Sequence, residues 1–238
     1  MARKENMEFL ASIYSTSVKK NKTIINLDDY DALLTWLFGK EKTIAVCAEK
    51  AYRDLQRNLR GIAEMPKKEE YKSETYNKIA SCIDELLKME VCGREEFDTW
   101  HHESCQKIRE LSNKHNIPKW VKWMERSVFP YGLAQKWLNM TIKNMLVMEK
   151  WNDELDKIRK QLHAPVDSYV LQAASEMLGI KIINKQGQLS LYKEGITKPW
   201  SKWGYSDYVR FQEELRNAVE CSMDWEFDAW NKTKDKRK

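Results

Sequence analysis

A lysine and an aspartate stand where each could take part in covalent chemistry. Lys136 lies within FPYGLAQKWLNMTIKNML, residues 129–146, a predicted helix that is apolar on almost every side. Burial lowers the pKa of a lysine because desolvation disfavours the charged form, and the neutral amine is a nucleophile. Asp167 stands just before SYVLQAASEML. A carboxylate at that position could stabilise developing positive charge or deprotonate the nucleophile.

Both residues also have a purely structural interpretation. The Lys136 side chain could extend from the first turns of its helix to reach solvent. Asp167 could serve only as the N-terminal cap of the helix that follows it. Such roles are common, so the surrounding motifs have to decide between structure and catalysis.

Two motifs supply this context. In GLAQKWLN, Gly132, Lys136 and Asn139 have hairpin-motif spacing, and PVDSYVLQAASEMLGI, residues 165–180, places Asp167 before a helix ending in Leu-Gly. Together they resemble the signature of the helix-hairpin-helix DNA glycosylases. The separation of 31 residues between Lys136 and Asp167 is similar to that of the archaeal 8-oxoguanine glycosylase branch, which has no iron–sulfur cluster. Ala134 replaces the second glycine of the motif.

The resemblance implies a reaction and a role for each motif residue. A base is flipped out of double-stranded DNA and excised, leaving an abasic site. Asp167 would stabilise the positive charge on the sugar, and Lys136 would attack C1′ to form a Schiff base that permits strand cleavage. The hairpin residues Gly132, Leu133, Ala134 and Gln135 would bind DNA, with backbone N–H groups on a phosphate. The substrate would be an oxidised purine or a modified base in phage DNA, attacked as an antiviral defence.

Aromatic side chains are candidates for stacking on the flipped base. The loop KPWSKWGYSDY, residues 198–208, is the strongest candidate for a pocket wall. His163 precedes Asp167 and could help to orient it. Each tryptophan could instead fill the helical core. The predicted base pocket comprises Trp120, Trp123, His163, Trp200, Trp203 and Tyr205.

The composition predicts an all-α protein that needs no metal or cofactor. Only 8 Gly and 5 Pro interrupt 238 residues, of which 42% are hydrophobic. The five cysteines form no CxxC pair and no secretion signal is recognisable, so we expect reduced thiols and a cytoplasmic protein. No apolar run reaches the roughly 18 to 20 residues of a membrane span. The net charge of +5 suits a polyanionic partner.

Apolar periodicity and punctuation residues place the elements that must position the site. The alternating stretch 181–192, around Gly187, favours one small β-hairpin. We expect a single domain of two lobes: a middle lobe at about 45–147, and a second lobe from 1–44 and 148–238 that ends in a basic tail at 232–238. The predicted helices cover residues 28–39, 42–63, 74–91, 93–118, 119–127, the part of 129–146 that follows its opening turn, 165–180 and 207–230.

Two other functions fit the same residues. A non-catalytic helix-hairpin-helix module would bind DNA without releasing a base. A helical interaction scaffold would keep Lys136 and Asp167 far apart. For the glycosylase we expect a monomer acting on double-stranded DNA.

Overall fold

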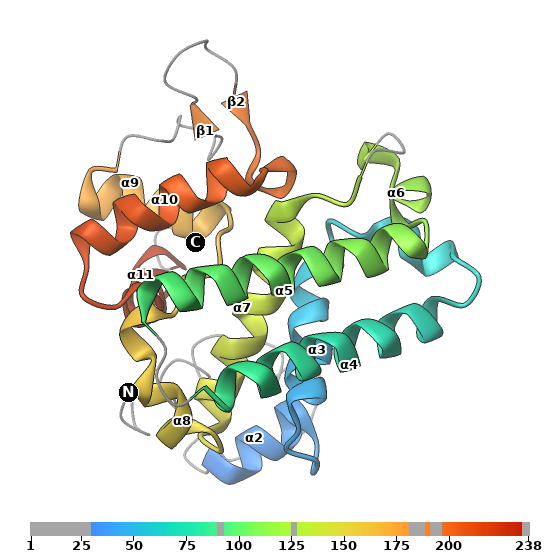
Figure 1. The fold of residues 1–238 in the computed structure, drawn as a ribbon, viewed down its shortest axis with the longest axis horizontal. Coiled ribbons are helices and arrows are strands. Elements are labelled where there is room, and N and C mark those ends of the chain that lie inside the picture. Colours follow the sequence, from blue (N-terminus) through green and yellow to red (C-terminus); the bar gives the residue numbers. More distant parts are fainter. Residues whose placement is uncertain (1–29, 90–92, 125–127, 181–188, 191–196, 235–238) are drawn as a thin grey trace.

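The computed structural model describes residues 30–89, 93–124, 128–180, 189–190 and 197–234, and the fold is all-α apart from one short strand pair (Figure 1). The elements are α2 (Tyr30–Phe38), α3 (Ile44–Leu55), η1 (Arg60–Glu64), α4 (Lys68–Leu87), α5 (Arg94–Lys114), α6 (Ile117–Trp120), η2 (Lys122–Met124), α7 (Tyr131–Met148), α8 (Asn152–Lys157), η3 (Arg159–Gln161), α9 (Ser168–Leu178), β1 (Leu189–Ser190), β2 (Thr197–Lys198), η4 (Trp200–Lys202), α10 (Tyr205–Ala218) and α11 (Ser222–Lys234). The predicted fold class is thus confirmed at the level of secondary structure.

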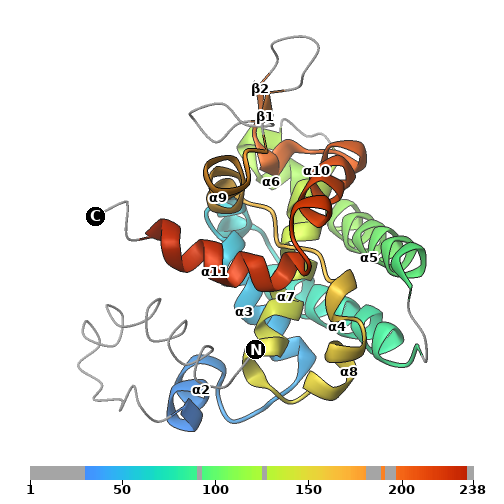
Figure 2. The ribbon, with the colours of Figure 1, turned by 90° about the vertical axis from the view of Figure 1, so that its left-hand side faces the viewer.

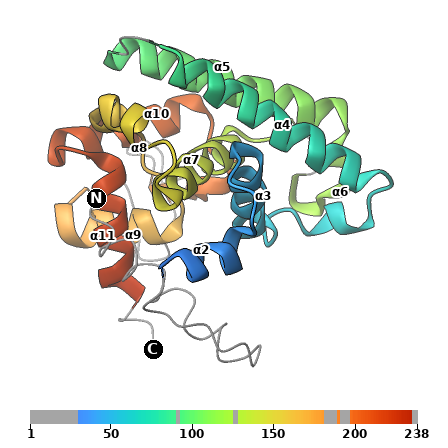
Figure 3. The same ribbon diagram turned by 90° about the horizontal axis from the view of Figure 1, so that it is seen from below.

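Helix α7 forms the centre of the molecule, as its all-round apolar sequence predicts. All of its residues except Met140 are buried. Seen from below, α7 lies between α3 on one side and α9 and α11 on the other (Figure 3). A helix enclosed in this way can present side chains only to the core or to an internal cleft.

The remaining helices pack around α7 in two groups. Helices α3 and α5 contact α7, and α4 packs on α3 and lies side by side with α5 (Figure 1). Helices α9 and α11 pack on each other on the opposite side (Figure 2). Helix α2 contacts α3, and its Tyr30 hydroxyl donates a hydrogen bond to the Val147 carbonyl at the end of α7. The two-lobe division at residue 147 stays a prediction.

Two predicted helices end earlier than periodicity indicates. The helix predicted over 42–63 stops at Leu55 and is followed by the 3-10 helix η1. The helix predicted over 207–230 is divided at Val219, whose φ of −139° and ψ of 151° are extended. Neither break contains proline, so tertiary packing rather than local sequence determines both. The second break turns α11 back across the end of the molecule toward α9.

The predicted β-hairpin exists with a different centre. Strands β1 and β2 pair antiparallel, with Leu189 opposite Lys198 and Ser190 opposite Thr197. The strands therefore flank residues 191–196 rather than Gly187, which lies outside the described residues. Helix α11 extends to Lys234, so it includes the first residues of the predicted basic tail. Residues 235–238 of that tail also lie outside the described residues.

Candidate active site

Lys136 and Asp167 lie in direct contact. Lys136 Nζ is 2.6 Å from Asp167 Oδ2, and the side chains are only 7% and 17% exposed. Asp167 is also the N-cap of α9, because its Oδ1 accepts hydrogen bonds from the backbone N–H groups of Tyr169 and Val170 at 2.9 and 3.0 Å. One carboxylate oxygen of Asp167 thus caps α9 and the other contacts Lys136. Capping the helix therefore leaves Asp167 free to act on a ligand as well.

Gln135 fixes the segment before Asp167 against α7. Its side chain donates to the Val166 carbonyl at 3.1 Å and accepts from the Val166 N–H at 3.2 Å. It also donates to the Gly132 carbonyl at 2.8 Å and is fully buried. In this conformation the Gln135 amide positions Val166, the residue next to Asp167, and the contact of Gln135 with DNA stays a prediction.

The ion pair lines a cleft of about 560 Å³. A second buried ion pair lines the same cleft: Lys143 Nζ of α7 lies 2.5 Å from Glu226 Oε2 of α11, with side chains 4% and 2% exposed. Arg53, Asp54 and Arg57 add charges near the end of α3. Aromatic side chains complete the lining: Phe38, Tyr169, Trp200 and Trp230.

The pKa of Lys136 shifts in the opposite direction to the sequence prediction. Burial alone lowers the pKa of Lys136, but the Asp167 carboxylate raises it more, with help from Glu226 and Asp54, so the net pKa lies above 10.5. Burial raises the pKa of Asp167, but the Lys136 ammonium and the Val170 N–H lower it more, and the net pKa lies below 3.8. In the free protein the pair is an ammonium and a carboxylate.

Lys143 is the lysine with the lowered pKa. Its burial lowers the pKa more than Glu226 raises it, and the neighbouring Lys136 ammonium lowers it further. Lys143 Nζ also lies 4.6 Å from the centre of the Phe227 ring. Two ammonium groups in one cleft repel each other, so a change in the charge of one alters the pKa of the other.

The predicted phosphate-binding hairpin is not open to a ligand. Gly132, Leu133 and Ala134 are buried in the first turn of α7. The Gly132 N–H donates to the Trp203 carbonyl at 3.0 Å, and the Leu133 and Ala134 N–H groups donate to the Pro130 carbonyl. Helix η4 covers this end of α7 so closely that a Cβ on Gly132 would lie 2.0 Å from the Trp200 carbonyl oxygen. In this conformation these N–H groups have backbone acceptors and lie under η4, and their binding to DNA phosphate stays a prediction.

The predicted base pocket is brought together only in part. Trp200 lines the cleft with Lys136 and Asp167. Trp203 is fully buried and packs edge-on against the Phe211 ring. Tyr205 is 40% exposed, and its ring lies against that of His102, tilted by 49° with the centroids 3.9 Å apart. The rings of Trp120 and Trp123 lie half-buried on α6 and η2, outside the cleft lining.

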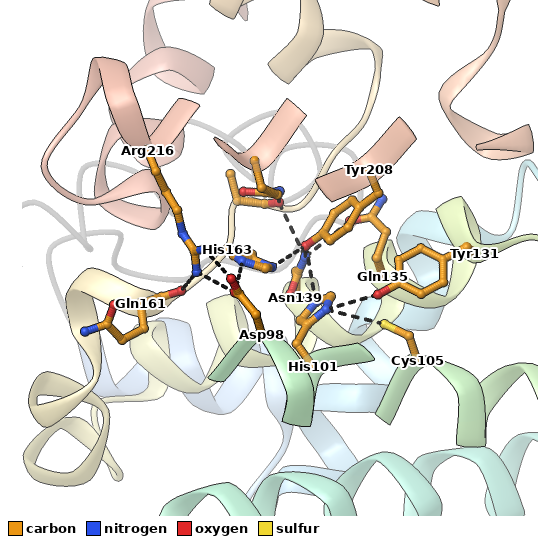
Figure 4. A network of polar contacts seen from close by, with 12 residues as sticks. Asp98, His101, Cys105, Tyr131, Gln135, Asn139, Gln161, His163, Tyr208 and Arg216 are labelled. Atoms are coloured by element: carbon orange, nitrogen blue, oxygen red, sulfur yellow. Dashed lines mark hydrogen bonds and ion pairs between the residues drawn. The ribbon is translucent and has the colours of Figure 1, made fainter. Parts of the chain in front are cut away.

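His163 belongs to a buried polar network that does not line the cleft (Figure 4). Its Nε2 lies 2.9 Å from Asp98 Oδ1, and its Nδ1 lies 2.8 Å from the Tyr208 hydroxyl. Tyr208 in turn accepts from Asn139 Nδ2 at 2.9 Å and contacts His101. The network fixes α5, α7 and α10 around the segment that leads to Asp167. His163 therefore supports the site without facing the cleft.

Sequence reasoning missed Lys143, Glu226, Tyr169 and Trp230 as cleft residues. Lys143 carried a signal, because it lies seven residues after Lys136 and therefore two turns along the same helix face. Glu226 carried none, since its place opposite Lys143 depends on the break between α10 and α11.

Comparison with protein-family models, with curated proteins and with solved structures gave no match. No group of three or more His, Cys, Asp or Glu side chains in the described part of the chain could hold a metal ion. Among the described helices, none combines the length and the hydropathy needed to cross a membrane.

Proposed function

We propose that this protein is a DNA glycosylase of the helix-hairpin-helix type that excises a flipped base through Lys136 and Asp167. The observation that carries the proposal is the 2.6 Å contact between Lys136 Nζ and Asp167 Oδ2 in the wall of a cleft of about 560 Å³. That volume lies in the range of roughly 300 to 1,000 Å³ that is usual for small-ligand sites. An amine and a carboxylate side by side are the two groups that this reaction requires at C1′.

The charges of the pair suggest the order of events. The ordinary pKa values of the two groups, 10.5 and 3.8, already make transfer of the proton from Lys136 to Asp167 unfavourable by about 9 kcal/mol. Their shifts widen the gap. Asp167 is therefore a poor base toward Lys136 in the free protein, and its carboxylate is better suited to stabilising positive charge on the sugar.

The departing base is the better acceptor for the lysine proton. The bond between C1′ and the base nitrogen breaks with its electron pair on the base, and the Lys136 ammonium transfers a proton to that nitrogen. The lone pair freed on Nζ then forms a new bond to C1′. A proton moves from Nζ to the ring oxygen O4′ as the sugar opens to the Schiff base, from which strand cleavage can follow.

The other lining groups suit a nucleobase. Lys143 and Glu226 offer a hydrogen-bond donor and an acceptor next to each other. Every nucleobase carries a neighbouring acceptor and donor on its pairing edge, so this pair supports a base in the cleft without selecting one. Tyr169, Trp200 and Trp230 offer rings for stacking. Oxidised purines and modified bases of phage DNA both remain substrate candidates.

A survey of substrates tests the proposed function. Oligonucleotides carrying single oxidised, alkylated or otherwise modified bases, and phage genomic DNA, are incubated with the protein, and free base is measured by mass spectrometry. We expect release from one class of base with wild type and not with Asp167→Asn. Tight DNA binding without release of any base would support a non-catalytic DNA-binding module instead. Neither binding nor release would favour an interaction scaffold.

A further inference from the structure

The buried start of α7 raises the question of where DNA would be held. The Gly132, Leu133 and Ala134 N–H groups already have backbone acceptors, and η4 covers them. A base can enter the cleft only if the phosphates on both sides of it are positioned. If the protein is a glycosylase, as proposed, another surface next to the cleft has to bind the backbone.

Exposed cations gather on the segments beside the cleft. They follow α3 and continue over η1, α6, η2 and η4, and we refer to these five residues as the basic strip: Arg57, Arg60, Lys119, Lys122 and Lys202. Arg57 itself lines the cleft, as does Trp200 at the start of η4. The strip therefore begins at the mouth of the cleft.

Specific contacts hold these segments side by side. Gly61 of η1 lies so near α6 that a Cβ there would be 1.7 Å from the Trp120 carbonyl oxygen. Trp123 Nε1 of η2 donates to the Asn58 carbonyl at 2.7 Å, and Asn58 lines the cleft. Lys202 Nζ of η4 lies 5.8 Å from the centre of the Trp123 ring. Residues from three parts of the sequence thus form one surface around Trp123.

The cations of the strip are available to an anion. Arg57, Arg60, Lys119 and Lys122 have no ion pair with any carboxylate in the described part of the chain. Cations elsewhere on the surface are paired internally, as Arg53 is with Glu49 and Lys107 with Glu85. Asp54 and Glu64 are the nearest acidic residues in sequence to the start of the strip. Cations without internal partners release counterions when they contact phosphates, which favours binding of a polyanion.

Half-buried aromatic rings interrupt the strip. Trp120 and Trp123 alternate in sequence with Lys119 and Lys122, and Lys202 Nζ lies near the Trp123 ring; both tryptophans are only half-buried, so part of each is accessible to a sugar or an unstacked base. Cations interleaved with aromatic rings are typical of nucleic-acid surfaces. We infer that the basic strip, rather than the hairpin at the start of α7, holds the DNA backbone next to the flipped nucleotide.

The test compares two triple variants with the same change in charge. The strip variant is Arg60→Gln/Lys119→Gln/Lys122→Gln. The control variant is Lys78→Gln/Lys88→Gln/Lys157→Gln, which neutralises exposed lysines of α4, its C-terminal cap and α8. Affinity for a labelled duplex is measured by fluorescence anisotropy at several salt concentrations. Circular dichroism tests whether each variant is folded. A further control variant, Lys119→Arg/Lys122→Arg, changes the side chains of the strip but keeps their charge.

We expect the strip variant to bind at least ten-fold more weakly than wild type at low salt, and the control variant to change affinity by less than about three-fold. The slope of log affinity against log salt should fall by about 2 to 3, because each lost phosphate contact removes about 0.9. The arginine variant should bind as wild type does. Equal weakening in the strip and control variants, with wild-type binding and base release intact, overturns the inference alone. No DNA binding by wild type overturns the proposed function together with it.

Discussion

Lys143 lies two helical turns after Lys136 in α7, and the two ammonium groups line one cleft, each against a carboxylate from another helix. Asp167 comes from the start of α9 and Glu226 from α11. The balance of burial and charge differs between the two: Asp167 raises the pKa of Lys136 more than burial lowers it, whereas burial, together with the Lys136 ammonium, lowers the pKa of Lys143 more than Glu226 raises it. The cleft therefore holds one lysine that stays charged and a second that releases its proton more readily.

The variant Asp167→Asn separates the role of Asp167 as a helix cap from the role of its negative charge. Asparagine caps helices as well as aspartate does, so α9 should persist. The substitution removes the carboxylate that stabilises the sugar cation, and we expect base release to fall by about 100-fold or more. DNA affinity should remain near that of wild type. The measurement is single-turnover base release beside an anisotropy titration; full activity of the variant would mean that Asp167 only caps α9.

The Lys143–Glu226 pair is tested by comparing the loss of one charge with the loss of both. Glu226→Gln leaves a buried ammonium without its counter-charge and should lower the free energy of unfolding by about 3 to 5 kcal/mol. Lys143→Met/Glu226→Met removes both charges and should recover most of that loss. Base release should stay low in the double variant because the donor and acceptor for the base are gone. Recovery of both stability and activity would show that the pair is only structural.

Gln135→Leu tests whether Gln135 is a positioning residue. Leucine fills the buried space but leaves the N–H and C=O groups of Val166 without their partners, at a cost of about 1 to 3 kcal/mol in unfolding free energy. Base release should fall because Asp167 is no longer held, while DNA affinity at low salt should not change. Urea unfolding and anisotropy measure the two effects. A large loss of DNA affinity with normal stability would restore Gln135 as a DNA contact.

Stability should fall between pH 6.5 and pH 4. Burial lowers the pKa of His163 to about 4, more than Asp98 raises it, and burial also places the pKa of His101 well below 6.5. Below pH 6.5 the unfolded chain therefore binds protons that the folded chain does not, which lowers the free energy of unfolding by about 3 kcal/mol for His163 alone. Asp98 and Asp167, whose pKa values are lowered, weaken the fold only when the pH falls below about 4.

The variant His163→Asn provides the control for this pH dependence. Urea unfolding at pH 7, 5.5 and 4 should show a smaller loss of stability in the variant than in wild type, because one of the two buried imidazoles is gone. An equal loss in both proteins would contradict the assignment to His163.

The sequence predicts the helices that carry their own signals. Helix α7 is recognisable because apolar residues occur on almost every side of it, and the start of α9 is recognisable because Asp167 precedes an amphipathic segment. The proximity of Lys136 to Asp167 followed from motifs rather than from periodicity. The division at Val219 carries no glycine or proline, so the place of Glu226 could not be predicted.

The remaining differences arise from contacts between distant segments. The pKa of Lys136 depends on a carboxylate 31 residues away, and distance along the chain does not give the 2.6 Å contact that reverses the effect of burial. The sequence suggests that the N–H groups at the start of α7 are available to a ligand. In the structure the Gly132 N–H donates to the carbonyl of Trp203, about 70 residues later in the chain. Tertiary packing decides both, and no local pattern records it.

Borohydride trapping tests the central claim most directly. A duplex carrying the base released in the survey is incubated with wild type, Lys136→Ala and Lys143→Ala in the presence of borohydride, and covalent adducts are separated on a denaturing gel. The account predicts an adduct with wild type, a weaker adduct with Lys143→Ala, none with Lys136→Ala, and attachment at Lys136 by mass spectrometry, because only Lys136 contacts Asp167. An adduct that persists in Lys136→Ala, or base release by wild type without any adduct, would contradict the role of Lys136 as the nucleophile.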